Sequence, residues 1–207
     1  TATIGRMSER IAFIGGGNMA SAIIGGLIKQ GFAVSQLDVV EPQAPARQLL
    51  QNQFAITAHD GPGSFLDRAD LVVMAVKPQN FKQAALQVRL RTKNALHLSV
   101  AAGIPSSSIA RWLDTDRIVR SMPNTPALIG QGITGLFARS GVSASDKQWI
   151  ERVVVTMGQD LWFEREEQLD AVTALSGSGP AYVFYFMEAM ISAGIEMGLS
   201  AAQAQKL

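Results

Sequence analysis

The sequence of 207 residues predicts an α/β protein in which a doubly wound, largely parallel sheet is followed by an all-helical segment. Three observations lead to this prediction. Short β-branched runs alternate with segments of helical period from Arg10 onward, the run 71–74 is wholly apolar, and no strand pattern follows Leu169. A wholly apolar strand is typical of the centre of a parallel sheet covered on both faces. We therefore expect a three-layered domain over residues 7–165 and the start of a helical domain over residues 166–207.

The strands are predicted from runs of β-branched and apolar residues. In chain order they are 11–14, 37–40, 55–57, 71–75, 95–99 and 117–121, with 133–138 and a short edge strand at 160–163 further along. Met19, Ile23 and Leu27 repeat at a step of four and predict a helix over 18–30 that ends at Gly31. Further helices are expected at 45–53, 65–69, 79–88, 107–113 and 144–157, and beyond residue 169 the pattern is helical except for an insert at 176–180.

The composition excludes several functional classes. With no cysteine, the chain holds no disulfide, thiolate zinc site, iron–sulfur cluster or cysteine nucleophile, and the cytoplasm is the expected compartment. A net charge of +1 without a long basic run gives no footprint for nucleic acid, so small molecules are the expected partners. The two histidines, His59 and His97, lie far apart, so no metal site is expected. Residues 1–6 resemble an expression remnant, with Met7 as the native start.

The segment 181–199 is almost entirely apolar and long enough to span a bilayer. It carries Glu188, Ser192 and Glu196 on one helical stripe, and carboxylates near the middle of a membrane helix are unfavourable. A soluble helix with no membrane partner is therefore expected. Because a helix that is polar along one stripe alone must be buried on several sides, the segment predicts a subunit interface.

The first predicted strand runs into a G-x-G-x-x-A turn that opens a helix. Gly15 permits the tight turn, Gly17 lets a diphosphate approach the backbone, and Ala20 allows close packing of helix on strand. The free N–H groups of the helix N-terminus would then bind phosphate. Such a string alone is also found in turns without a ligand. Its place between a strand and a helix, at the start of a βαβ pattern, predicts a dinucleotide site.

The identity of the dinucleotide depends on the end of the second strand. Glu41 stands 24 residues after Gly17 and would accept a hydrogen bond from a ribose 2′-hydroxyl, which favours NAD. Against this, Pro42 can turn the Glu41 side chain away, and Arg47 on the following helix can reach a 2′-phosphate. A solvated carboxylate without a ligand is an equal interpretation of Glu41, so the residues alone leave NADH and NADPH open.

Two further loops follow strands of the same sheet. Ligands of open α/β sheets lie beyond the carboxyl ends of the strands, so Lys77 in the loop 75–78 would meet ribose, nicotinamide or substrate. A surface lysine beside a turn is the alternative, and a role for Lys77 as general acid stays open. In the next loop, small Ala101, Ala102 and Gly103 leave room for a ring.

The sixth strand leads into a polar loop, 120–126, that two prolines make rigid. Asn124 in this loop carries a donor and an acceptor, which suits a nicotinamide carboxamide or a substrate, although a structural turn is an equal interpretation. The insert 176–180 contains Ser176, Gly177, Ser178 and Gly179 before a proline. At a helix N-terminus these residues would form a cup for a substrate carboxylate, and a simple hinge is the alternative.

Five stretches together resemble the pyrroline-5-carboxylate reductase family. They read GGGNMA at 15–20, AVKP at 75–78, VAAG at 100–103, RSMPNTPA at 120–127 and DAVTALSGSGPAY at 170–182. The resemblance extends from about Arg10 to Leu207, and the last two stretches distinguish this family from other reductases with the glycine turn. It implies a Rossmann domain that binds NAD(P)H, followed by a helical dimerisation domain that completes the active site with a second subunit. It also implies reduction of 1-pyrroline-5-carboxylate to L-proline, the last step of proline biosynthesis.

The resemblance further implies which residues form the sites. The cofactor would lie against Ile14, Gly15, Gly16, Gly17, Asn18, Met19, Ala75, Val76, Lys77, Pro78, Ala101, Ala102, Gly103 and Asn124. Ser176, Gly177, Ser178 and Gly179 would border the substrate. The family generally uses NADPH, which opposes the simple interpretation of Glu41. The family's main substrate loop lies further along the helical domain, so a chain that ends at Leu207 resembles a truncated version.

No acid–base pair or Ser-His-Asp arrangement is apparent, and hydride transfer to a protonated cyclic imine needs little beyond proximity and alignment. Two other functions stay open. One is a dinucleotide-binding module without turnover. The other is a related two-domain reductase of another small acid. A hydroxy-acid dehydrogenase is disfavoured, because it would require a lysine in its helical domain and none occurs between Lys147 and Lys206.

Overall fold

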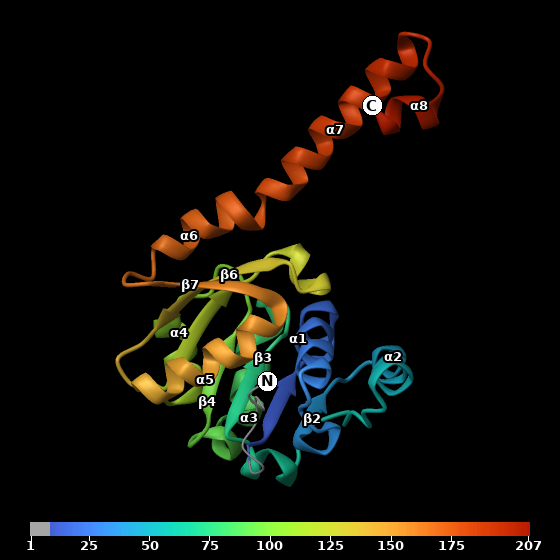
Figure 1. Cartoon of the computed structure of the whole chain (residues 1–207). Coiled ribbons are helices and arrows are strands. Elements are labelled where there is room, and N and C mark those ends of the chain that lie inside the picture. Colours follow the sequence, from blue (N-terminus) through green and yellow to red (C-terminus); the bar gives the residue numbers. More distant parts are fainter. Residues whose placement is uncertain (1–8) are drawn as a thin grey trace.

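A computed structural model describes residues 9–207 of the chain. The predicted remnant at residues 1–6 and the predicted start at Met7 lie outside the described residues. The first part of the chain forms one sheet with helices on both faces, and the last part forms a helical arm that projects from it (Figure 1).

The sheet has seven strands in the order β2-β1-β3-β4-β5-β6-β7. Their bounds are β1 Ile11–Ile14, β2 Leu37–Val40, β3 Leu71–Met74, β4 Leu96–Ser99, β5 Ile118–Met122, β6 Gly132–Ala138 and β7 Gly158–Phe163. Strands β1 to β5 are all parallel, β6 is antiparallel to β5, and β7 is parallel to β6 at the edge. The central β3 is fully buried at every position, as its wholly apolar sequence predicts.

Two apolar cores lie on the two faces of this sheet. Helices α1 (Asn18–Lys29), α2 (Ala44–Phe54) and α5 (Ala144–Val154) pack on one face, and α3 (Pro78–Thr92) and α4 (Ser106–Leu113) on the other. Alternate strand residues supply the cores, so that Phe13 of β1 belongs to the first and Ile14 to the second. The predicted fold class, a doubly wound Rossmann-like sheet followed by a helical region, is confirmed.

One predicted strand, at 55–57, is wrong. Ala55 adopts the left-handed conformation, with φ 57°, and ends α2. The chain then runs beside β2 for a single bridge, between His59 and Val40. This short apolar run after a helix therefore forms a helix end and a connection, and only His59 beyond it pairs with β2.

The first helix of the helical region is α6 (Gln168–Val172), whose Leu169 is buried beside Gly135 of β6. A π-helical turn, Thr173–Gly177, leads into α7 (Gly179–Glu196), and α8 (Ala201–Lys206) folds back on α7 (Figure 1). The α-helix is thus interrupted at the predicted insert, 176–180, but by a π-helical turn and a bend at Ser178 and not by a loop. The backbone hydrogen bond here spans five residues instead of four, since the Ser178 N–H donates to the carbonyl of Thr173.

Helix α7 projects beyond the sheet domain and none of its 18 residues is buried. Aromatic side chains are exposed along it, with Phe184 at 60% and Tyr185 at 75%. Within residues 9–207, no helix combines the length and the apolar character that crossing a membrane requires.

Candidate functional site

Five loops meet at one edge of the sheet, because the carboxyl ends of parallel strands lie at the same edge. They follow β1, β2, β3, β4 and β5. Backbone bonds join neighbouring loops: Gly15 N–H donates to Val40 at 2.8 Å, and Ala75 N–H to Ile14 at 2.8 Å. The sheet therefore brings the glycine turn, Glu41 and the loop 75–78 together, with the loops 100–103 and 123–125 alongside.

The glycine turn between β1 and α1 is open where a diphosphate would approach. Gly15 has φ +99°, and a Cβ there would lie 2.6 Å from the Ala75 carbonyl oxygen, so only glycine fits. Gly17 is the N-cap of α1, and a Cβ on it would meet nothing within 4 Å. No side chain caps α1 and its first turn holds no acidic residue. An uncapped N-terminus beside open space fits a dinucleotide diphosphate.

The carboxylate of Glu41 points back into the protein. One oxygen accepts the Gly16 N–H at 2.9 Å and the other accepts the Gln43 N–H at 2.8 Å. The residue is 8% exposed. Both oxygens thus already bind backbone N–H groups, so the predicted bond from a ribose hydroxyl would have to be a second bond to one of them.

Arg47 of α2 binds the backbone that follows β2. Its guanidinium donates to the carbonyl oxygens of Glu41 at 2.9 Å and Pro42 at 2.7 Å, both through Nη1. These bonds hold the cation beside the connection between β2 and α2. An arginine has five N–H donors, so the others remain to bind a further acceptor.

The next two loops offer small or exposed residues to the same edge. Lys77 is exposed at the N-cap of α3, immediately before Pro78. Ala101 is buried, while Ala102 and Gly103 are exposed, and Gly103 has φ +73°. A lysine and an uncrowded turn therefore lie where the sequence predicted them.

Asn124 has a structural bond that fixes its amide. Its Oδ1 accepts the Ile133 N–H at 2.9 Å, which ties the loop after β5 to β6. With the oxygen committed, the Nδ2 group is left as the donor. The two interpretations of Asn124, turn and site, are therefore compatible: the oxygen holds the turn and the amide nitrogen is available to an acceptor.

The segment from Ser176 to Gly179 lies beside the end of β5. A Cβ on Gly177 would come within 2.9 Å of the Met122 side chain. The Ser176 hydroxyl donates to the carbonyl of Val172 at 3.0 Å. Helix α7 begins at Gly179, but the N–H groups of Ser178 and Ala181 already bond to the carbonyls of Thr173 and Ser178, so the argument from a free helix N-terminus no longer supports an anion cup. Its position next to the loop of Asn124 is the remaining observation in favour of a site.

Sequence reasoning missed one network, which joins the helical region to the sheet domain. Glu166 pairs with Arg120 of β5 at 2.5 Å and accepts the N–H and hydroxyl of Ser106, at 2.5 and 2.6 Å. Burial alone would raise the pKa of the Glu166 carboxyl, but the bonds from Ser106 and Arg120 outweigh it and hold that pKa below its usual value. Arg120 within an apolar strand was the available signal, because a buried arginine needs a partner.

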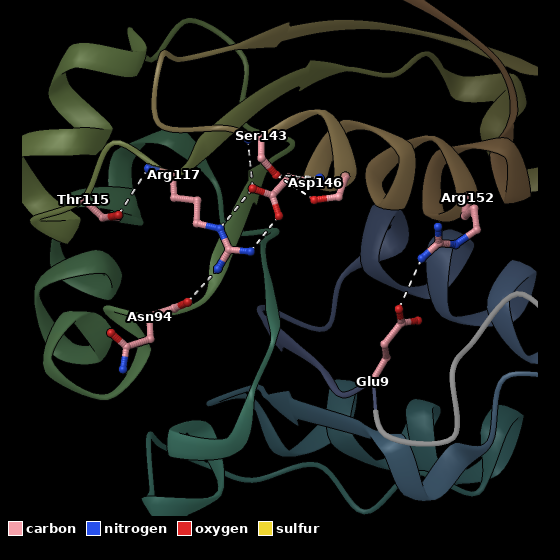
Figure 2. Close-up of polar contacts among 8 residues, drawn as sticks. Glu9, Asn94, Thr115, Arg117, Ser143, Asp146 and Arg152 are labelled. Atoms are coloured by element: carbon pink, nitrogen blue, oxygen red, sulfur yellow. Dashed lines mark hydrogen bonds and ion pairs between the residues drawn. The ribbon is translucent and has the colours of Figure 1, made fainter.

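A polar cavity of about 450 Å³ lies at the opposite edge of the sheet, near the amino ends of the strands. Its wall includes Arg117, which donates to both oxygens of Asp146 and to the carbonyl of Asn94 (Figure 2). Glu9 accepts from Arg152 beside it. Burial would raise the pKa of Asp146, but its bonds to Arg117 and Ser143 lower it overall. These groups satisfy one another and lie away from the five loops.

Comparison with known proteins places these features in a family. Residues 166–207 match the model for pyrroline-5-carboxylate reductase dimerisation, and residues 10–103 match the model for coenzyme F420-dependent NADP oxidoreductases. The chain is 45% identical over 203 residues to the pyrroline-5-carboxylate reductase of Pseudomonas aeruginosa, covering 97% of this chain and 74% of that one.

Solved structures agree. The pyrroline-5-carboxylate reductase of Coxiella burnetii superposes with a TM-score of 0.88 at 34% identity, over 96% of this chain and 74% of that one. The Plasmodium falciparum pyrroline carboxylate reductase, solved with NADP bound, gives a TM-score of 0.84 at 25% identity, over 98% and 75%.

Proposed function

The chain belongs to the pyrroline-5-carboxylate reductase family, and we propose that the five-loop edge of its sheet is where the reaction of that family takes place. The protein is an NAD(P)H-dependent oxidoreductase that reduces 1-pyrroline-5-carboxylate to L-proline. The observation that carries this conclusion is the 45% identity to a named reductase over almost the whole chain. The glycine turn, open over Gly17 and backed by Ala75, supports the site.

The cofactor would be held mainly by backbone. Its diphosphate would lie on the turn from Ile14 to Met19, and the rest would follow the loops 75–78 and 101–103. We propose NADPH as the preferred form. The buried carboxylate of Glu41 supports this, because it is engaged with backbone N–H groups, and so does the guanidinium of Arg47 beside it. The NADP bound to the Plasmodium relative points the same way.

Reduction of a cyclic imine requires a hydride at carbon and a proton at nitrogen. The bound cofactor supplies the hydride. The residues of the protein then have to bind the substrate carboxylate, align the ring and exclude water. The Asn124 amide nitrogen would hold an acceptor of cofactor or substrate, and Ser176 to Gly179 would border the ring from the helical side. No residue is assigned a proton transfer.

The helical region, which we delimit as residues 166–207, would complete the site as part of a dimer. The exposed apolar length of α7 supports this assignment, since a helix apolar on most sides is stable only when buried. A homodimer is the smallest assembly that would cover it, and a larger homo-oligomer built from dimers is compatible. For the compartment, the cytoplasm remains the prediction from a composition without cysteine.

The direct test is oxidation of NADPH and of NADH, followed by absorbance, with and without 1-pyrroline-5-carboxylate. The expected result is oxidation that depends on the imine, with L-proline as product and the higher kcat/KM for NADPH. Titration of each cofactor by its fluorescence, without substrate, measures binding separately. Tight binding with no turnover would instead favour the module without catalysis, and no binding would contradict the assignment of the glycine turn.

A further inference from the structure

Glu41 occupies the position at which Rossmann folds commonly place an acid that binds the adenosine ribose. Its contacts here are different. Both carboxylate oxygens accept backbone N–H groups, one from Gly16 inside the glycine turn and one from Gln43 at the start of α2. The carboxylate therefore links the two segments that flank the end of β2.

The surroundings hold the Gly16 backbone against Glu41. A Cβ on Gly16 would lie 2.7 Å from the Leu50 side chain and 3.2 Å from the Cβ of Glu41, so this peptide packs directly on α2 and the end of β2. Gly15 N–H bonds to Val40 at 2.8 Å immediately beside it. The N–H groups of Gly15 and Gly16 thus bind within the protein, whereas Gly17, the next residue, borders open space at the uncapped start of α1.

The negative charge of the Glu41 carboxylate is balanced by the groups around it. Its second oxygen meets an N–H at the amino end of α2, where the helix dipole favours a negative charge. The Arg47 guanidinium, on the carbonyls of Glu41 and Pro42, adds a cation to the same connection. If the carboxylate turned outward toward a ribose hydroxyl, it would leave two backbone N–H groups without partners at a residue that is 8% exposed, which is unfavourable.

From these contacts we propose that Glu41 is a positioning residue. Glu41 fixes the glycine turn in the shape that accepts a diphosphate, and it does not distinguish NADPH from NADH. The residue that distinguishes the two cofactors is Arg47. This inference rests on the proposed function, since it concerns how that reductase holds its cofactor. It predicts that loss of the carboxylate weakens both dinucleotides equally, whereas an acid that binds the ribose would weaken NADH selectively.

The experiment compares wild type with Glu41→Ala, Glu41→Gln and Arg47→Ala. Dissociation constants for NADPH and NADH are measured by fluorescence without substrate, and exchange of the Gly16 amide hydrogen is followed by NMR in the free protein. Glu41→Ala is expected to raise both constants about 10-fold with an unchanged ratio, which corresponds to about 1.4 kcal/mol. Gly16 exchange is expected to accelerate, and Glu41→Gln, which keeps one acceptor, to give a smaller effect on each measurement.

Arg47→Ala is the contrasting variant and is expected to raise the constant for NADPH about 10-fold more than that for NADH. The proposal is overturned if Glu41→Gln or Glu41→Ala changes the ratio of the two constants 10-fold, or if Gly16 exchange stays as in wild type. Circular dichroism identifies a variant that does not fold, and Glu41→Gln then carries the test. Absence of imine-dependent turnover in wild type would contradict the proposed function alone, because the binding ratio is measured without substrate.

Discussion

Glu166 and Arg120 form an ion pair across the junction between the sheet domain and the helical region, although they are 46 residues apart in the sequence. The guanidinium side is 9% exposed and the carboxylate side 22%. Arg139 reaches the same cluster through the Ser106 hydroxyl, at 3.0 Å. The first residue of the helical region is therefore attached to both β5 and the start of α4, close to the loop of Asn124.

Glu166→Gln should destabilise the protein and disturb the junction. Glutamine can still accept one bond from Ser106, but it leaves the buried Arg120 without its counter-charge, and we expect a loss of about 2 kcal/mol in the free energy of unfolding. Urea unfolding measures it. Glu164→Gln, at an exposed carboxylate of the same connection, is the control and should stay within about 0.5 kcal/mol of wild type. Equal stability of the two variants would contradict a structural role for the pair.

His97 should make stability depend on pH. Burial lowers the pKa of this imidazole from 6.5 to about 4, and Nε2 lies 3.1 Å from the Thr92 hydroxyl. That hydroxyl donates to Val88, so the Nε2 hydrogen is the donor between them. Because the unfolded chain binds a proton more readily, the stability contributed by neutral His97 is complete above pH 6.5 and falls as the pH drops toward 4.

Between pH 6.5 and pH 5 the expected loss is about 2 kcal/mol, at about 1.4 kcal/mol for each pH unit. Urea unfolding at a series of pH values measures the slope. His97→Gln should flatten it, whatever its effect on absolute stability, because the titrating group is gone. His59→Gln, at the other, half-exposed histidine beside Asp38, is measured over the same pH series for comparison. A slope that survives in His97→Gln would show that another group titrates in this range.

Prediction from sequence succeeded where local residues decide the structure. The apolar run of β3 predicts a central strand, because burial on both faces of the sheet admits few residue types. The glycine turn after β1 is predicted as directly, because a positive φ favours glycine. The prediction was right only in part at 176–180, where glycine, serine and proline favour a break and the structure has a π-helical turn and a bend at Ser178. The hydroxyls of Thr173 and Ser176 bond back to the carbonyls four residues earlier, a pattern that bends a helix without ending it.

The candidate site was predictable as a set of loops and not as a set of contacts. Fold logic places Glu41, Lys77 and Asn124 at one edge, since each follows a parallel strand. It does not say that the carboxylate of Glu41 turns toward Gly16 or that Asn124 Oδ1 is held by Ile133. Those contacts depend on side-chain rotamers and on neighbours distant in sequence, for which the pattern of residues contains no signal.

Gly15→Ala should weaken dinucleotide binding in addition to lowering the stability of the protein. A Cβ at this position would lie 2.6 Å from the Ala75 carbonyl oxygen, so the turn must move away from β3. Gly31→Ala is the control, because Gly31 has a similar φ of +93° but open space around its Cβ. Both variants should lose about 1 kcal/mol or more from backbone strain. Fluorescence titration should show NADPH binding weakened at least about 10-fold in Gly15→Ala only. Equal affinities in the two variants would contradict the assignment of the turn.

Asn124→Asp should separate the two roles of that side chain. Aspartate keeps an oxygen for the Ile133 N–H, so the thermal midpoint should stay near that of wild type. It removes the amide donor and adds a negative charge, so kcat/KM for the imine should fall about 10-fold or more. Asn124→Ala should lose both stability and activity. If Asn124→Asp were as active as wild type, the residue would be a turn former and nothing more.

Phe184→Glu should dissociate the assembly through α7. The helix has no buried residue in the single chain, and Phe184, in its first half, is 60% exposed. In a twofold interface the substitution occurs twice, and each buried carboxylate without a partner opposes association. Analytical ultracentrifugation should show a dimer or larger for wild type and a dissociation constant raised at least about 10-fold for the variant. Leu90→Glu, at an apolar residue of α3 that is 79% exposed, is the control and should leave association unchanged. The two variants differ only in which exposed apolar surface receives a charge, so equal dimers in both would mean that α7 is not the surface that joins the subunits.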